Sequence, residues 1–131
     1  MPPRIQTARG IAADALAHAA ADFPDLAPAA LDTARLDGRD AALALAIHRT
    51  ALQRWMTIEH LLDRFTKQPC RSLEPGLRGV LLSAGAQLLF MDRLPTHAVV
   101  DESVSLARAM VREGAPPLVN AVLRRLASLV S

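Results

Sequence analysis

Residues 75–95, PGLRGVLLSAGAQLLFMDRLP, decide the fold class of this chain. Pro75 suits the first turn of a helix, where its missing N–H would have no partner in any case. Pro95 interrupts the helical pattern at the other end of the segment. Apolar and small residues recur between them at helical spacing, at 77, 80, 81, 84, 85, 88 and 89. Because this segment is apolar nearly all round, we expect it to form the central helix.

Further segments on both sides of this helix have the same helical period. We expect helices over residues 5–21, 28–36, 40–67 and 96–112, and from Pro116 to the end of the chain. Thr96 is the expected N-cap of its helix, and Gly114 its terminator. No run alternates with period two for long enough to indicate a sheet, so the sequence predicts an all-α fold.

The composition limits the class of protein. The 131 residues suffice for one domain, spanning 1–131, and about half are apolar. Cys70 is the only cysteine, which favours a reducing compartment. The longest apolar run, 80–91, is too short to span a bilayer, and Asp14 interrupts the weak signal-like stretch near the N-terminus. These features predict a cytoplasmic protein without a membrane partner.

The sequence offers no apparatus for catalysis. Gly76-Leu77-Arg78-Gly79 has no preceding strand and lies inside a helical pattern, so it is a poor phosphate loop. His97 and Asp101 are four residues apart and could hold two corners of a metal site, but no further ligands follow at a recognisable spacing. We therefore expect no enzyme activity, no cofactor and no metal.

Arginine supplies nearly all of the basic side chains, since Lys67 is the only lysine. The net charge is only +2, so the placement of these residues matters more than their number. In a compact helical bundle a patch for RNA phosphates could form from Arg4, Arg9, Arg108, Arg112, Arg124 and Arg125. A solvated helix surface and a GC-rich codon usage explain the same residues, so both interpretations remain open.

Two stretches carry a family resemblance. Residues 88–108, LLFMDRLPTHAVVDESVSLAR, and 118–126, LVNAVLRRL, resemble the signature of the NusB family in order and spacing. The resemblance extends more loosely to 39–65 and 71–75. It implies a NusB-like fold of six to seven helices in two packed three-helix units.

The resemblance also implies a function. NusB proteins act in transcription antitermination, where they bind a boxA-type leader RNA together with a small-subunit ribosomal protein. By position, Arg4 and Arg9 would touch RNA, and Leu118 and Asn120 would lie near the RNA or partner surface.

A second branch of the family is the N-terminal domain of the 16S rRNA cytosine-5 methyltransferase (RsmB). The segments LLDRF (61–65), MDR (91–93) and VLRR (122–125) are closer to that branch. The chain stops where the methyltransferase domain would begin, so an rRNA-targeting domain or a companion protein is the alternative function.

The chain departs from the family pattern at several positions. Leu82 and Ala86 stand where a basic residue and an aromatic are usual, Asp101 replaces an Asn, and Leu118 replaces a Phe. Each departure bears on boxA recognition. The third hypothesis is therefore a protein-interaction module that has lost RNA binding and that forms a homodimer through its apolar helix faces.

Overall fold

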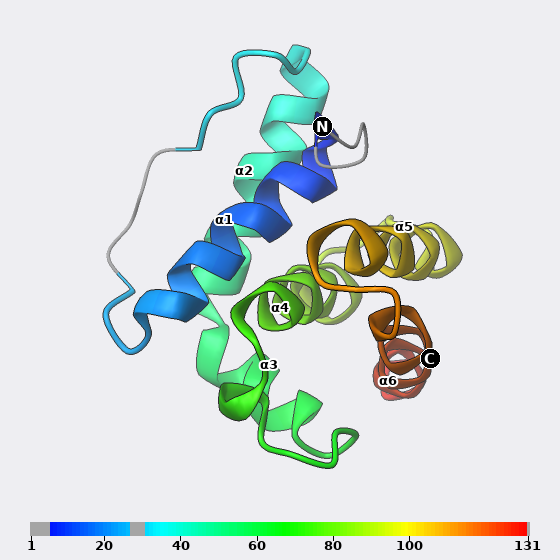
Figure 1. Ribbon diagram of the computed structural model, residues 1–131. Helices are drawn as coiled ribbons and strands as arrows, with labels where there is room; N and C mark the ends of the chain where they lie inside the picture. The colour runs from blue at the N-terminus through cyan, green and yellow to red at the C-terminus, as the bar shows by residue number, and fades with distance from the viewer. Residues whose placement is uncertain (1–5, 27–30, 131) are drawn as a thin grey trace.

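The computed structural model describes residues 6–26 and 31–130. It is all-α, as predicted, with six α-helices in the described residues. Figure 1 shows α1 (Ala8–Asp22), α2 (Gly38–Gln53), α3 (Trp55–Leu62), α4 (Pro75–Phe90), α5 (Thr96–Met110) and α6 (Ala115–Ser128), and a 3₁₀ turn spans Cys70–Ser72. No helix among these residues is long and apolar enough to cross a membrane.

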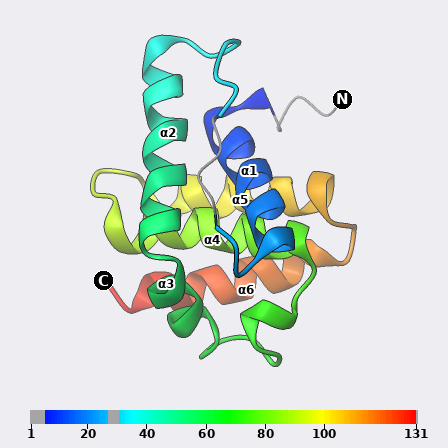
Figure 2. The same ribbon diagram turned by 90° about the vertical axis from the view of Figure 1, so that its left-hand side faces the viewer.

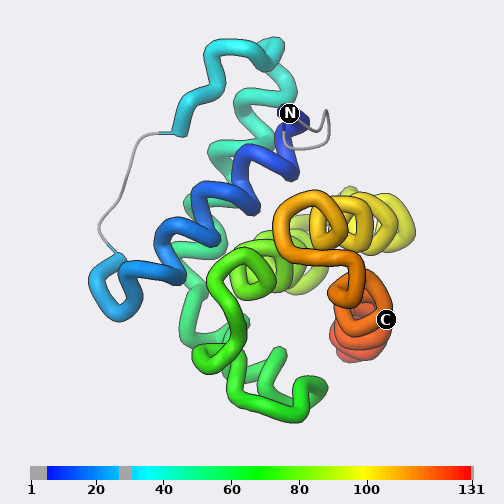
Figure 3. Tube along the Cα trace, in the orientation of Figure 1, coloured from blue at the N-terminus to red at the C-terminus, as the bar shows by residue number. Residues whose placement is uncertain are grey.

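Helix α4 occupies the centre, which confirms the prediction from its sequence. Every residue from Leu77 to Gln87 is buried. Helices α1 to α3 pack on one side of α4, and α5 and α6 pack on the other (Figures 1 and 2). Figure 3 shows that α1 and α2 begin at the same end of the molecule and run in the same direction. The fold is thus two groups of three helices, α1–α3 and α4–α6, joined along α4.

The contact between α1 and α4 depends on a glycine. A Cβ atom built on Gly79 would lie 2.6 Å from both the carbonyl oxygen of Ala13 and the amide nitrogen of Ala17. No real side chain tolerates such distances to backbone atoms, so only glycine permits this close approach of the two helices. The glycine that resembled part of a phosphate loop is therefore a packing residue.

The single helix expected over residues 40–67 is wrong. The helix is interrupted at Arg54, whose backbone angles are φ −112° and ψ 17°. This residue follows the end of α2 and precedes the start of α3. The apolar spacing continues through the break because Ala51, Trp55 and Ile58 are all buried on either side of it. The bend presses Ile58 against α4, where its Cγ2 atom lies 2.5 Å from the Cβ position of Gly85.

Other boundaries also differ from expectation. The helix expected over 28–36 is absent from residues 31–36, and residues 27–30 lie outside the described part of the chain. Helix α1 begins at Ala8, where the Thr7 hydroxyl oxygen accepts a hydrogen bond from the Gly10 N–H. Thr96 is the first helical residue of α5 rather than its cap, and α5 ends at Met110.

A buried ion pair lies beside the core. Arg78 on α4 is 4% exposed, and its Nη2 atom lies 2.8 Å from Glu59 Oε2 on α3. The guanidinium also donates to the carbonyl oxygen of Ala20 and lies over the rings of Phe23 and Trp55. Because each charge has a partner, burial is tolerated here, and the pair joins α1, α3 and α4.

Candidate nucleic-acid interface

The structure places Arg9 in a network that joins three helices. Its Nε atom donates to Gln87 Oε1 of α4 at 2.6 Å, and its Nη1 atom donates to Glu102 Oε1 of α5 at 3.0 Å. The Thr7 hydroxyl donates to the other Glu102 oxygen at 2.6 Å. The Arg9 side chain is only 16% exposed. Its hydrogen bonds connect α1 to α4 and α5, so it has a structural role as well as a charge. Arg4 lies outside the described residues.

Arg108 and Arg112 each face a carboxylate. Arg108 Nε lies 3.5 Å from Glu113 Oε2, and Arg112 Nη2 lies 3.0 Å from Glu74 Oε1. All four side chains are exposed to solvent. An RNA phosphate that approached either arginine would have to compete with its acidic neighbour, but pairs in solvent are weak and exchange readily.

Arg124 and Arg125 on α6 are exposed and differ from the others. Arg124 Nε donates to Asn120 Oδ1 one turn earlier at 3.0 Å. Within residues 6–26 and 31–130, neither arginine has a carboxylate at ion-pair distance. The two cations are therefore available to an anion from solvent.

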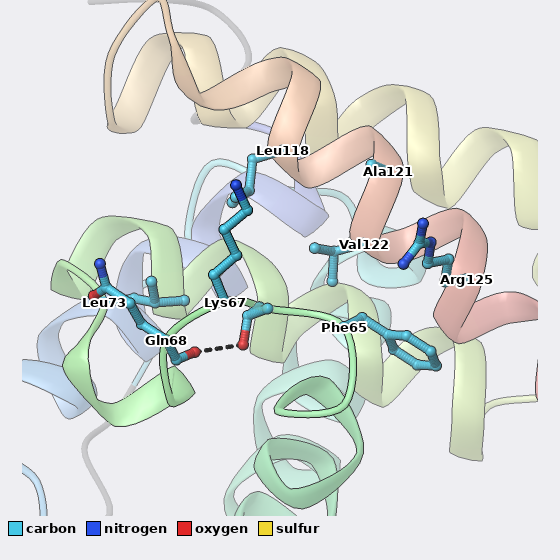
Figure 4. Close-up of a pocket in the computed structure, with 9 residues that line it drawn as sticks. Phe65, Lys67, Gln68, Leu73, Leu118, Ala121, Val122 and Arg125 are labelled. Atoms are coloured by element: carbon cyan, nitrogen blue, oxygen red, sulfur yellow. Dashed lines mark hydrogen bonds between the residues drawn. The ribbon is translucent and has the colours of Figure 1, made fainter.

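A hollow of about 380 Å³ lies between α6 and the segment that leads from α3 to α4. Its α6 wall contains Leu118, Ala121, Val122 and Arg125. Figure 4 shows the facing wall, where the Lys67 side chain extends toward Leu118. The structure thus brings together two residues predicted from sequence, Leu118 and Arg125, with a lysine that was not predicted.

The predicted arginines do not form one unpaired cationic patch in the described chain. Arg9, Arg108 and Arg112 have carboxylate partners, whereas Arg124 and Arg125 do not. Their contact with RNA stays a prediction. Sequence reasoning missed Phe65 and Lys67, although an aromatic and a lysine two residues apart near Pro69 were a usable signal.

The only cysteine, Cys70, belongs to the segment beside the hollow, but its side chain is buried. Cys70 is fully buried, and desolvation, followed by the neighbouring Glu59 carboxylate, raises the pKa of its thiol to about 12. A nucleophilic cysteine needs the opposite shift. No group of three or more His, Cys, Asp or Glu side chains in the described part of the chain could hold a metal ion.

Comparisons with known proteins identify the family and the fold. The NusB family model matches residues 6–128. The chain is 32% identical over 126 residues to "Ribosomal RNA small subunit methyltransferase B" of Pseudomonas putida, an alignment that covers 95% of this chain and 28% of that protein. It is 39% identical over 62 residues to "Transcription antitermination protein NusB" of Brucella anthropi, covering 47% of this chain and 37% of that one.

The chain therefore spans less than a third of the length of the methyltransferase. A solved structure of T. maritima NusB superposes with a TM-score of 0.76 at 21% identity, over 98% of this chain and 92% of the other. That likeness shows the same fold.

Proposed function

Because the chain belongs to the NusB family, we propose that it is a non-catalytic RNA-binding module in transcription antitermination or ribosomal RNA biogenesis. The observation that carries the proposal is the pair Arg124 and Arg125, two exposed cations on α6 with no carboxylate partner in the described residues. Arginine forks of this kind bind phosphates bidentately.

The other predicted residues take secondary roles in this proposal. Arg4, which lies outside the described residues, remains a candidate RNA contact from the resemblance alone. Arg9, Arg108 and Arg112 contribute once phosphates exchange with their carboxylate partners. Asn120 orients Arg124 through their hydrogen bond. Leu118 forms part of the contact with the small-subunit ribosomal protein.

Fluorescence anisotropy tests the proposal. A labelled boxA-containing RNA and a scrambled control are titrated with the chain, with and without the small-subunit ribosomal protein, at several salt concentrations. We expect affinity to fall as salt rises, as counterion release requires. Failure of every RNA to bind at low salt, with or without the ribosomal protein, would refute RNA binding.

Two variants distinguish a specific role of the α6 arginines in RNA binding from a general effect of positive charge. Arg124→Gln is expected to weaken binding about three- to tenfold and to reduce the salt dependence, since one phosphate contact is lost. Arg39→Gln is the matched control because Arg39 is an exposed arginine in the first turn of α2, at the end of that helix far from α6 (Figure 2). Equal effects of the two variants would contradict a specific role of α6.

A second function has specific support from the relatives. The similarity to the Pseudomonas putida methyltransferase covers nearly the whole of this chain, whereas the similarity to the Brucella anthropi protein covers about half. This favours a domain that targets, or accompanies, a 16S rRNA methyltransferase. Tighter binding to 16S rRNA fragments than to boxA RNA would support it, and the reverse order would favour antitermination. Mass measurement in solution shows whether the chain is a homodimer.

A further inference from the structure

The hollow beside α6 combines an aromatic ring, an amide and two cations. Phe65 and Gln68 come from the segment after α3, Lys67 lies between them in sequence, and Arg125 comes from α6 (Figure 4). These segments lie more than 50 residues apart in sequence, so the fold assembles the hollow. The proposed function uses Arg125 and Leu118 as surface contacts but does not use the hollow that they form with the segment after α3.

The charge around the hollow has one sign. Lys67 and Arg125 line it, and the lining residues in the described chain include no carboxylate. Two acidic residues are neighbours of the lining in sequence, and both have partners. Glu74 pairs with Arg112 at 3.0 Å, and Asp63 accepts a hydrogen bond from the Cys70 N–H at 2.6 Å. An anionic occupant is therefore favoured over a neutral or cationic one.

The remaining lining suits a planar, hydrogen-bonding ring. Phe65 offers an aromatic surface, and Leu73 and Leu118 complete an apolar interior. The Thr66 hydroxyl donates to the Gln68 carbonyl oxygen at 2.5 Å, which closes the turn that carries the exposed Gln68 side chain. Figure 4 shows the Gln68 amide at the end of the hollow opposite the Phe65 ring, where it can donate and accept hydrogen bonds.

The size of the hollow distinguishes among possible occupants. A volume of about 380 Å³ lies at the lower end of the range of about 300–1,000 Å³ typical of small-molecule sites. One base with its sugar is a ligand of that class, whereas a partner helix needs an extended groove. We propose that this hollow receives one unstacked base of single-stranded RNA, with its phosphate held between Lys67 and Arg125. The proposal rests on the RNA-binding function and adds the site where a base is read.

Nuclear magnetic resonance tests the pocket without any assumption about the RNA sequence. The ¹⁵N-labelled chain is titrated with AMP, GMP, CMP and UMP, and separately with inorganic phosphate and with an acidic peptide that carries one apolar side chain. We expect the nucleotides to shift amide signals in residues 65–68 and 118–125, and phosphate to shift them much less. Equal shifts with phosphate alone would reduce the hollow to an anion site and overturn the proposal. Shifts with the peptide and none with nucleotides would also overturn it, in favour of a protein partner.

Substitutions at Phe65 test stacking in RNA. Phe65→Leu keeps an apolar side chain and removes the ring, so we expect affinity for single-stranded RNA to fall about tenfold. Phe65→Tyr keeps a ring and should retain affinity, which shows that any loss is not general unfolding. Lys67→Gln should lower the salt slope by about 0.7, the value for one phosphate contact on a single strand.

The outcomes separate this proposal from the proposed function. Binding of RNA by the native chain that is unaffected by Phe65→Leu refutes the base pocket and leaves RNA binding intact. Nucleotide-induced shifts around Phe65 without binding of any RNA refute the proposed function and leave a nucleotide pocket. Loss with both Phe65→Leu and Phe65→Tyr, in chains whose thermal melting is unchanged, also overturns the stacking argument.

Discussion

The close approach of α1 and α4 leads to a sharp prediction for Gly79→Ala. The added Cβ would lie 2.6 Å from two backbone atoms of α1, and backbone yields less easily than the tip of a side chain. Overpacking of a core costs about 1–3 kcal/mol, and this contact belongs at the upper end. Alanine recovers about 1 kcal/mol because it is the better helix former. The free energy of unfolding should therefore fall by about 2 kcal/mol.

Thermal unfolding followed by circular dichroism measures this effect. For a domain of this size, a loss of about 2 kcal/mol corresponds to a fall of roughly 6–10 °C in melting temperature. Gly38→Ala is the matched control, since Gly38 is the first residue of α2 and nothing lies within 4 Å of its Cβ position. That variant should melt at or slightly above the native temperature. If Gly79→Ala behaved in the same way, the steric argument for the α1–α4 contact would be refuted.

Three further predictions concern charged and titratable groups. Glu59→Gln should lower the free energy of unfolding by about 3 kcal/mol, because it leaves the Arg78 charge buried without a carboxylate; in urea denaturation, adding Arg78→Met should restore part of the loss, and additive losses would count against the pair. Glu102→Gln should raise RNA affinity about two- to fivefold in anisotropy titrations, because the half-buried carboxylate no longer competes with phosphate for Arg9, and an unchanged affinity would remove Arg9 from the RNA surface. Burial lowers the pKa of His48 from 6.5, so the unfolded chain binds more protons below about pH 6.5 and stability should fall as the pH drops from 7.5 to 5; His48→Gln should flatten this dependence in pH-dependent melting, and an identical slope would show that another group controls it.

The sequence predicted the helical class and the central helix, because both depend on local signals. Pro75 is the first residue of α4, whereas Pro95 precedes α5 and lies beyond the end of α4 at Phe90; the apolar periphery of α4 shows that neighbours surround it. The break at Arg54 could not be predicted in this way. Apolar periodicity records which residues are buried, and both α2 and α3 bury residues on the same spacing, so the pattern contains no sign of a change in backbone dihedral angles.

Contacts between distant residues also escaped prediction. Glu59 and Arg78 are 19 residues apart and lie on different helices, so nothing local marks them as partners. The hollow needs Phe65 and Lys67 on one segment and Arg125 on another, and only the packing of α6 against the segment after α3 brings them together. Arg9 was predicted from the resemblance, but its bonds to Gln87 and Glu102 depend on the placement of α1 against α4 and α5.

The buried thiol of Cys70 can report how often the segment beside the hollow opens to solvent. Cys70 has no exposed surface, and its raised pKa of about 12 keeps the sulfur protonated at neutral pH. A thiol reagent can therefore modify the chain only during excursions that open residues 63–73 to solvent, and the modification rate counts those excursions. Since Cys70 is the only cysteine, the signal comes from one place. A ligand that stabilises the closed form of this segment should slow thiol modification. The native Cys70 side chain therefore reports both local opening and ligand binding.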